Sequence, residues 1–401
     1  MKKLLIIETE YEGHYLTGYI KYILRALKGK RIKIFLLLSE KTIKFGKGAL
    51  KILKDEGINY NIETFKTPTI NKTNFISLII YQLKLYFLIK RKFNKIERKY
   101  NFDHVILTSI QRLDKIISIF GSPFGNTKFS GIFLGLKFHL NHFNIKTSST
   151  NHLLSKYLFK RLLNISTFSK VIINDYLLKK YIFKNKWQNK DKILFLHDPK
   201  EFNFIFKKKY SLNKLGIPKN QFVILVYGAI INSKGVEELL KIYKSKSSKN
   251  IHCLIVGKQI GSTKKFLHQS KYVKKLINKK QISVYDNWQA EKKEALFFHA
   301  SDVIWIGYKN YPYPSGVLYQ AVSVKKPSLI SNKGFINELN KIYKIGIAID
   351  IYNPKSILDA IKQFQIPQKK ATLRKSLSTF FKISDPRIWT KTFENIFEKI
   401  I

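Results

Sequence analysis

The chain has 401 residues, enough for two domains of ordinary size. Hydrophobic residues make up 45% of the sequence and aromatic residues 14%, which excludes a disordered chain. Lys and Arg total 74 against 26 Asp and Glu, so the formal net charge is +48, but the lysines are spread along the whole chain. This spread favours a solvated basic surface over a dedicated nucleic-acid site, and it predicts attraction to anionic lipid and to phosphorylated ligands.

Cysteine usage and the N-terminal residues predict a cytoplasmic protein. The single cysteine, Cys253, has no second cysteine with which to form a disulfide or a metal cluster. Residues 1–9 hold a short apolar run without a small-residue cleavage site, which favours a first strand over a signal peptide. The histidines show no ligand spacing and the sequence contains no Asp-x-Asp element, so we expect no metal and no other cofactor.

Short apolar runs of strand length alternate with longer segments of helical periodicity, first in one half of the chain and then again in the other. This pattern is typical of parallel sheets built from strand-helix-strand units, so we expect two doubly wound α/β domains. The predicted strands of the first half span 4–8, 32–38, 60–65, 104–108, 131–136, 171–174 and 193–196. Those of the second half span 222–227, 251–256, 282–285, 303–306, 328–331 and 347–350.

Domain boundaries follow from the same pattern. Residues 1–200 form the first predicted domain, and 221–375 form the second. The segment 201–220 carries Pro218 and several lysines without clear periodicity, so we interpret it as a linker. A helical segment, 376–401, closes the chain and in one interpretation returns to the first domain. Ligands of open parallel sheets bind at the carboxyl ends of strands, so the loops there are the places to look for chemistry.

Residues 75–89 form the longest apolar stretch, which leads into the basic residues of 90–99. The stretch contains Lys84 and falls short of the ~20 residues that span a bilayer, so we expect no transmembrane helix. Two interpretations remain open. The segment is either an amphipathic basic helix that touches an anionic membrane surface, or a core helix with a solvated cationic end.

The first informative motif covers 226–240, where an apolar strand leads through a turn with Gly228 into the pair Lys234-Gly235 and a helix. Backbone N–H groups in a first helical turn attract anions, and the ammonium of Lys234 adds a full positive charge. The motif therefore predicts a phosphate site. The alternative is an ordinary strand-to-helix turn with an exposed lysine.

The second motif covers 300–331, where a strand leads into a loop that starts at Tyr308 and is rich in Tyr, Pro and Gly. Ser315 is the predicted N-cap of the next helix, so the N–H groups of Gly316 and Val317 would face an anion. Gln320 lies about one turn further on and could hydrogen-bond sugar or ribose hydroxyls. Its alternative role is that of a half-exposed helix residue.

Together the two motifs resemble the donor domain of retaining GT-B glycosyltransferases of family 4, also called group 1 glycosyl transferases, over residues 220–365. The resemblance implies an α/β GT-B fold, with two Rossmann-like domains that face each other across a cleft. It implies that the second domain binds the donor and that Lys234 contacts the donor diphosphate. The family's arginine position holds Ala229, and its two glutamate positions hold Pro312 and Gln320, which marks a divergent member.

In the first half, Gly13-His14 follows the first strand and resembles the acceptor-side loop of the same family. His14 would contact acceptor or donor phosphate and act with Lys234 in catalysis, with a purely structural role as its alternative. His139 falls near the place where the family often has a histidine beside the reaction centre. Both histidines and Gly13 are therefore acceptor-side candidates.

The resemblance implies an enzyme that moves a sugar from a UDP- or GDP-sugar to a hydroxyl, with retention of configuration, in bacterial cell-surface polysaccharide synthesis. The implied acceptor is a saccharide or a lipid-linked saccharide, so we expect contact with the inner membrane surface. Two alternatives stay open. One is a catalytically impaired nucleotide-sugar-binding protein of the same fold, and the other is a basic nucleic-acid-binding protein, although the sequence holds no nucleic-acid module.

Overall fold

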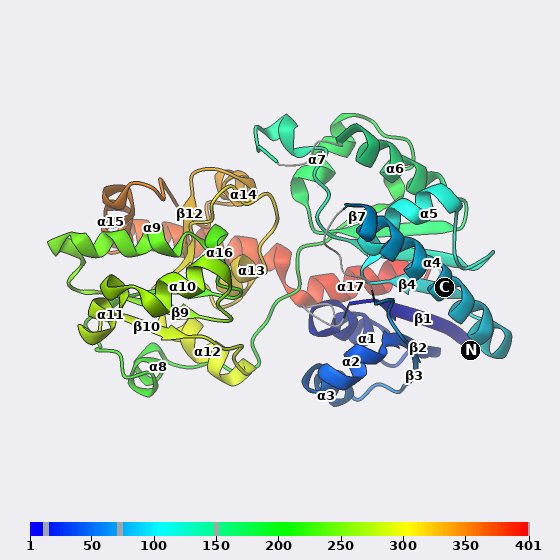
Figure 1. Ribbon diagram of the computed structural model, residues 1–401, viewed down its shortest axis with the longest axis horizontal. Coiled ribbons are helices and arrows are strands. Elements are labelled where there is room, and N and C mark those ends of the chain that lie inside the picture. The colour runs from blue at the N-terminus through cyan, green and yellow to red at the C-terminus, as the bar shows by residue number, and fades with distance from the viewer. Residues whose placement is uncertain (11–15, 70–74, 148–151, 400–401) are drawn as a thin grey trace. The chain divides into compact units, whose positions relative to one another are not determined.

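The computed structural model describes residues 1–10, 16–69, 75–147 and 152–399. It divides into two compact units, which are described separately (Figure 1). Unit 1 comprises Met1–Pro199 and Pro386–Ile401, and unit 2 comprises Lys200–Asp385. Gly13 and His14, two of the acceptor-side candidates, lie outside the described residues.

Unit 1 is built on a seven-stranded parallel sheet with the strand order β3-β2-β1-β4-β5-β6-β7. The interior strand β1 is apolar and fully buried from Leu4 to Ile7, as expected for a parallel strand with helices on both faces. The strands are β1 (Lys2–Glu8), β2 (Ile32–Ser39), β3 (Tyr60–Phe65), β4 (His104–Leu107), β5 (Lys128–Phe133), β6 (Phe168–Ile173) and β7 (Ile193–Phe195).

The predicted strands of the first half are confirmed to within two residues at each end, except that β6 begins three residues before its predicted start and the fifth strand is displaced at both ends. The fifth was predicted at 131–136, and β5 instead begins at Lys128 and ends at Phe133. The predicted range was wrong because Gly135 adopts φ +91°, a backbone conformation outside the strand region, and so ends the extended segment early.

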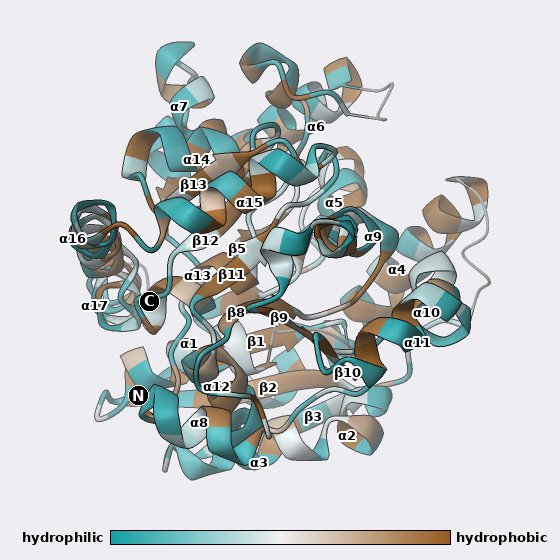
Figure 2. Ribbon diagram, turned by 90° about the vertical axis from the view of Figure 1, so that its left-hand side faces the viewer, coloured by the Kyte–Doolittle hydropathy of each residue, from teal (hydrophilic) through white to brown (hydrophobic). Residues whose placement is uncertain are grey.

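Helices cover both faces of this sheet. One face packs against α4, α5, α6 and α7, and the other against α1, α3 and α17. In Figure 2 the strands are largely brown, whereas the helices alternate between teal and brown residues. The helices are α1 (Lys21–Leu27), α2 (Glu40–Phe45), α3 (Lys47–Asp55), α4 (Phe75–Tyr100), α5 (Asp114–Phe120), α6 (His152–Asn164), α7 (Tyr176–Lys184) and α17 (Pro386–Phe397).

Helix α17 lies beside α1, as Figure 1 shows in red and blue, although nearly the whole chain separates them. The ring of Trp389 packs between Tyr19 and Tyr22, with centroid distances of 6.3 and 6.2 Å. Lys30 adds ion pairs to Glu394 at 2.5 Å and to Glu398. The last segment of the chain therefore completes the core of unit 1.

Unit 2 repeats the architecture with a six-stranded parallel sheet in the order β10-β9-β8-β11-β12-β13. All six strands predicted for the second half are confirmed within one residue. They are β8 (Phe222–Tyr227), β9 (Ile251–Val256), β10 (Ile282–Tyr285), β11 (Val303–Ile306), β12 (Ser328–Ser331) and β13 (Gly346–Ile349). The helices are α8 (Lys208–Lys214), α9 (Val236–Leu240), α10 (Gly261–Gln269), α11 (Lys271–Asn278), α12 (Glu291–Ala300), α13 (Gly316–Ser323), α14 (Phe335–Tyr343), α15 (Pro354–Gln363) and α16 (Pro367–Ser384).

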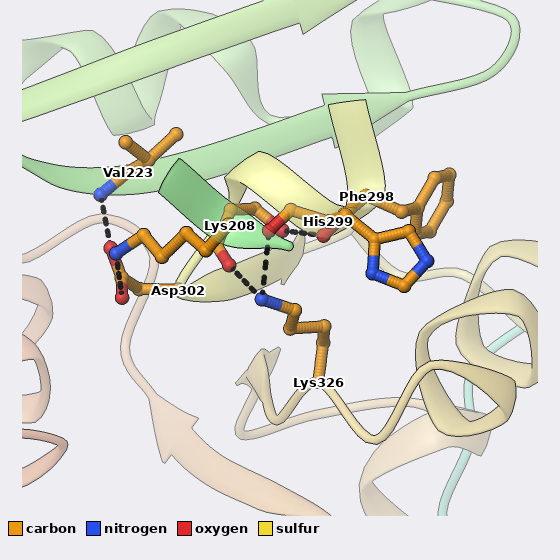
Figure 3. A network of polar contacts seen from close by, with 7 residues as sticks. Lys208, Val223, Phe298, His299, Asp302 and Lys326 are labelled. Carbon is orange, nitrogen blue, oxygen red and sulfur yellow. Dashed lines mark hydrogen bonds and ion pairs between the residues drawn. The ribbon is translucent and has the colours of Figure 1, made fainter. Parts of the chain in front are cut away.

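The segment interpreted as a linker, 201–220, contains α8 and is part of unit 2. Figure 3 shows why: Lys208 forms an ion pair of 2.5 Å with Asp302, whose other carboxylate oxygen accepts the backbone N–H of Val223 at 2.8 Å. Lys326 lies in the same network and donates to the carbonyls of His299 and Ser301. These bonds fasten α8 and the amino ends of β8 and β11 to one another.

The carboxyl end of β1 in unit 1 holds a buried carboxylate, that of Glu8. Its oxygens accept hydrogen bonds from the hydroxyls of Thr108 at 2.5 Å and Ser109 at 2.7 Å, and from the N–H of Glu10. Burial outweighs these bonds and raises the pKa of Glu8 to about 7. The folded chain therefore binds this proton more tightly than the unfolded chain does.

This raised pKa predicts a pH dependence of stability. Glu8 contributes to the free energy of unfolding through its tightly held proton. This contribution is complete below the unfolded pKa of 4.5 and is lost as the pH rises through about 7, and the loss amounts to about 3 kcal/mol. Glu8→Gln should make unit 1 lose less stability between pH 5 and 8 than the unaltered chain does. Urea unfolding, read by hydrogen exchange of β1 and β4 peptides, measures this. The exposed Glu40→Gln is the control, and equal losses in both variants would contradict the prediction.

Candidate functional site

The strand order of unit 2 reverses direction between β8 and β11, and the carboxyl ends of such a strand pair form the usual ligand site of a parallel sheet. Three segments meet there: the 3₁₀ turn η5 (Asn232–Lys234) after β8, the loop after β11, and the start of α13. The two sequence motifs thus lie at one place in the fold.

Lys234 lies at the centre of this place. Its ammonium donates to the hydroxyl of Tyr308 at 2.6 Å and to the carbonyl of Tyr227 at 3.2 Å, and it lies 4.1 Å from the ring centroid of Tyr308. Burial lowers the pKa of Lys234 to about 7 and raises that of Tyr308, which is 2% exposed. No carboxylate contributes to this pKa shift, so an anion brought beside Lys234 would favour its charged form.

A tight turn holds Lys234 in place. Gly235 adopts φ +66°, and a Cβ atom there would come within 2.5 Å of the carbonyl oxygen of Gly307. The indole N–H of Trp305 donates to the carbonyl of Lys234 at 2.7 Å, and the N–H of Lys309 donates to the carbonyl of Ser233 at 2.8 Å. The backbone that follows β8 is therefore fastened to the backbone that follows β11.

The helix after this turn differs from the prediction. Lys234 ends the 3₁₀ turn rather than opening a helix, and α9 begins at Val236 and has five residues. Its first turn holds Glu237 and Glu238, and Glu238 pairs with Lys309 at 2.9 Å. Since carboxylates occupy this helix start, Lys234 is the feature of the motif that fits an anion, and the phosphate site itself stays a prediction.

The start of α13 provides the second half of the site. Ser315 occupies the N-cap position as predicted, but its side chain makes no capping bond and lies 3.4 Å from the hydroxyl of Tyr308. The first intrahelical bond runs from the N–H of Leu318 to the carbonyl of Ser315, so the N–H groups of Gly316 and Val317 precede it. They are positioned to donate to a ligand.

Gly228, at φ +100°, lets the chain pass close to these groups. A Cβ atom on Gly228 would lie 3.7 Å both from the ammonium nitrogen of Lys234 and from Cγ2 of Val317. A Cβ atom on Gly316 would lie 3.5 Å from Cε of Lys200. Two lysine side chains therefore approach the first turn of α13, one from each of two different segments.

Gln320 lies one turn further along α13, where its amide donates to the carboxylate of Glu294 at 2.5 Å. The hydroxyl of Tyr227 bonds the same carboxylate. Burial raises the pKa of Glu294, whereas the bonds from Tyr227 and Gln320 and the charge of Lys200 lower it.

Sequence analysis missed Glu294. This residue precedes the buried Phe297 and Phe298 by three and four residues and so shares their face of α12, which is the signal that could have found it.

Comparison with known proteins decides the family of unit 2. Residues 207–376 match the family model described as glycosyl transferases group 1. The chain carries a group 1 glycosyl transferase domain. No curated protein matches the sequence with significance.

Solved structures extend the comparison to the whole chain. Anabaena Alr3699/HepE in complex with UDP is 15% identical, with a TM-score of 0.67, and 100% of this chain and 99% of that chain are covered. A glycosyltransferase from Rickettsia africae is 17% identical, with a TM-score of 0.66 and coverages of 100% and 98%. Sucrose-phosphate synthase from Thermosynechococcus elongatus is 12% identical, with a TM-score of 0.69 and coverages of 100% and 99%. These similarities show the fold, and the predicted GT-B class is confirmed.

The remaining candidate residue, His139, lies inside unit 1. Its side chain is fully buried, and Nε2 is 3.0 Å from Asp175, the residue that caps α7 by accepting the N–H of Leu178. The rings of Phe138 and Tyr181 pack on it. This arrangement fits a residue that holds α7 in place and leaves no exposed surface of His139 for an acceptor, so its acceptor-side assignment is not supported.

Two features are absent from the part of the chain that the structure describes. No group of three or more His, Cys, Asp or Glu side chains in it is arranged to hold a metal ion. No helix in it has the length and apolar character to cross a bilayer.

The turn at Gly235 predicts a specific loss of stability. Gly235→Ala combines a strained φ with a clash against the backbone of Gly307, so we expect unit 2 to lose more than ~2 kcal/mol. Gly216→Ala is a matched control, because Gly216 has the same φ of +66° and open space around it, and should cost about 1 kcal/mol. Thermal unfolding of both variants measures the difference. Equal melting temperatures would show that the contact with Gly307 does not constrain the turn.

Proposed function

We propose that the protein transfers a sugar from a UDP- or GDP-sugar to a hydroxyl of a saccharide acceptor in cell-surface polysaccharide synthesis. The observation that carries the proposal is the position of the Lys234 ammonium, bonded to Tyr308 beside the first turn of α13. A cation and backbone N–H groups that converge on one point fit a diphosphate. The UDP complex of the Anabaena protein, which shares the fold, supports a nucleotide donor.

In the proposed reaction the bond between the anomeric carbon and the diphosphate oxygen breaks, a bond from that carbon to the acceptor oxygen forms, and the acceptor hydroxyl passes its proton to the departing diphosphate. Lys234 and the N–H groups of Gly316 and Val317 stabilise the departing diphosphate electrostatically. The positive charge comes from the protein itself, so the proposal includes no metal. We propose retention, with the acceptor attacking the face from which the diphosphate leaves. His14 stays a candidate for the acceptor side.

The chemistry of Lys234 yields a test. The pKa of Lys234 is about 7, so above pH 7 its side chain is largely neutral, whereas a bound diphosphate favours the charged form. Above pH 7, binding of the diphosphate must therefore be accompanied by uptake of a proton on Lys234. The affinity for UDP or GDP should therefore be highest below pH 7 and fall by up to about tenfold per pH unit above it. Lys234→Met should bind weakly at every pH and lower turnover at least about 100-fold.

Calorimetry at pH 6 to 9 and a turnover assay with UDP- and GDP-sugars measure these effects. Lys241→Met, which removes an exposed lysine beyond α9, is the control. Unchanged turnover in Lys234→Met would remove this residue from the mechanism. Tight nucleotide binding without sugar transfer in the unaltered chain would favour the alternative of a binding protein.

We further propose that the acceptor is lipid-linked and that α4 contacts an anionic membrane. Ile76, Ile80 and Phe87 are exposed and lie within about 40° of one another around the helix axis. Phe120 of α5 extends this apolar stripe, with a centroid distance of 6.4 Å to Phe87. The charge of the helix suits an anionic bilayer, since its one carboxylate, Glu97, is bonded to the N–H of Phe102. The exposed cations of α4 are Lys84, Lys90, Arg91, Lys95, Arg98 and Lys99.

Vesicle binding tests this surface. The triple variant Ile80→Ser, Phe87→Ser, Phe120→Ser should bind phosphatidylglycerol vesicles at least about tenfold more weakly, because each apolar side chain contributes of order 1 kcal/mol or more when buried. The control Phe45→Ser, Ile62→Ser removes exposed apolar side chains elsewhere in unit 1. Cosedimentation with anionic and with neutral vesicles gives the affinities. Equal binding by the triple variant and the control would overturn the assignment of this surface.

A further inference from the structure

Glu294 is a carboxylate that the proposed reaction does not yet use. It lies on α12 between two hydrogen-bond donors, the hydroxyl of Tyr227 at the end of β8 and the amide of Gln320 on α13. Both donors are uncharged, and the charge of Lys200 acts on Glu294 as well. A half-buried carboxylate thus lies at the carboxyl ends of the strands, between two uncharged donors and close enough to Lys200 to feel its charge.

The surroundings of Glu294 argue for a ligand. Burying a carboxyl group is unfavourable, and burial raises the pKa of this one. A tie between α12 and α13 would need no ionisable group, since an uncharged amide at 294 could accept the same bonds. A carboxyl whose pKa is shifted, in a ligand-binding region of a fold, is a candidate for a function.

Its distance from the diphosphate site suggests which ligand group it meets. Gln320 follows Gly316 by four residues, so the two lie on one side of α13 about 6 Å apart along the axis. With a diphosphate at Gly316, Glu294 and Gln320 are within reach of the next part of the donor. That part, whether the ribose or the transferred sugar, carries neighbouring hydroxyl groups. A carboxylate can accept hydrogen bonds from two of them at once.

We propose that Glu294 binds a vicinal diol of the donor, accepting bonds from two hydroxyls while Gln320 stays beside it. The inference rests on the proposed function, because it takes the donor to be a nucleotide sugar. It assigns donor specificity to a residue on α12, outside both of the motifs that carry the diphosphate site. Glu294 is a binding residue here and takes no part in bond breaking.

The test compares ribonucleotides with their deoxy analogues. The unaltered chain should bind UDP or GDP about 10- to 100-fold more tightly than the 2′-deoxy or 3′-deoxy form if the diol is that of the ribose, and Glu294→Gln should reduce this ratio to below about threefold. If the diol belongs to the sugar, the variant should instead bind the nucleotide normally and lose a comparable factor in affinity for the nucleotide sugar. Either result supports the inference.

Three controls make the outcome decisive. Glu291→Gln changes a carboxylate one turn earlier on α12. It should leave intact both the ribo-to-deoxy ratio and the affinity for the nucleotide sugar. Tyr227→Phe removes a hydrogen-bond donor but keeps the carboxylate of Glu294. It should therefore also preserve the ribo-to-deoxy ratio and the affinity for the nucleotide sugar, even if it lowers the melting temperature. If Glu294→Gln still binds nucleotide and changes neither the ribo-to-deoxy ratio nor the affinity for the nucleotide sugar, this assignment alone is overturned. Failure of the unaltered chain to bind any nucleotide overturns the proposed function, and this inference with it.

Discussion

The joining of two loops through Lys234 is the constraint on which the site depends. The side chain of this residue binds Tyr308, and its carbonyl accepts the indole N–H of Trp305, so both ends of one residue hold the loop after β8 against β11. Gly235 permits that approach, since any side chain there would meet Gly307. Burial of the ammonium lowers its pKa, and the fold thereby prepares a cation whose charge responds to a bound anion.

The same region shows how residues outside a motif complete its chemistry. Around the start of α13, Lys234 approaches from one segment and Lys200 from another, while Glu294 reaches Gln320 from α12. Positive charge and backbone N–H groups gather at the first turn, and the carboxylate lies about one turn away. This polarity suits a ligand with an anionic part joined to a hydroxyl-rich part.

The sequence predicted most of the fold because parallel strands buried on both faces appear as apolar runs, and β8 and β9 are examples of such strands. It placed Lys234 and Ser315 together because both follow strands of one sheet. It could not give the short 3₁₀ turn before Gly235, which depends on contacts with β11. It also missed Glu294 and could not show that His139 is buried, since burial and partners from distant segments depend on the folded chain.

The return of the chain into unit 1 has a consequence for its synthesis. Helix α17 supplies Trp389, Phe393 and Phe397 to a core whose other members precede residue 200. The whole of unit 2 emerges from the ribosome before that helix does, so unit 2 can fold while unit 1 still exposes the apolar surface around Tyr19 and Tyr22. Nascent chains stalled before Pro386 would thus be natural clients for chaperones, and loss of these last residues would harm the half of the protein farthest from them in sequence.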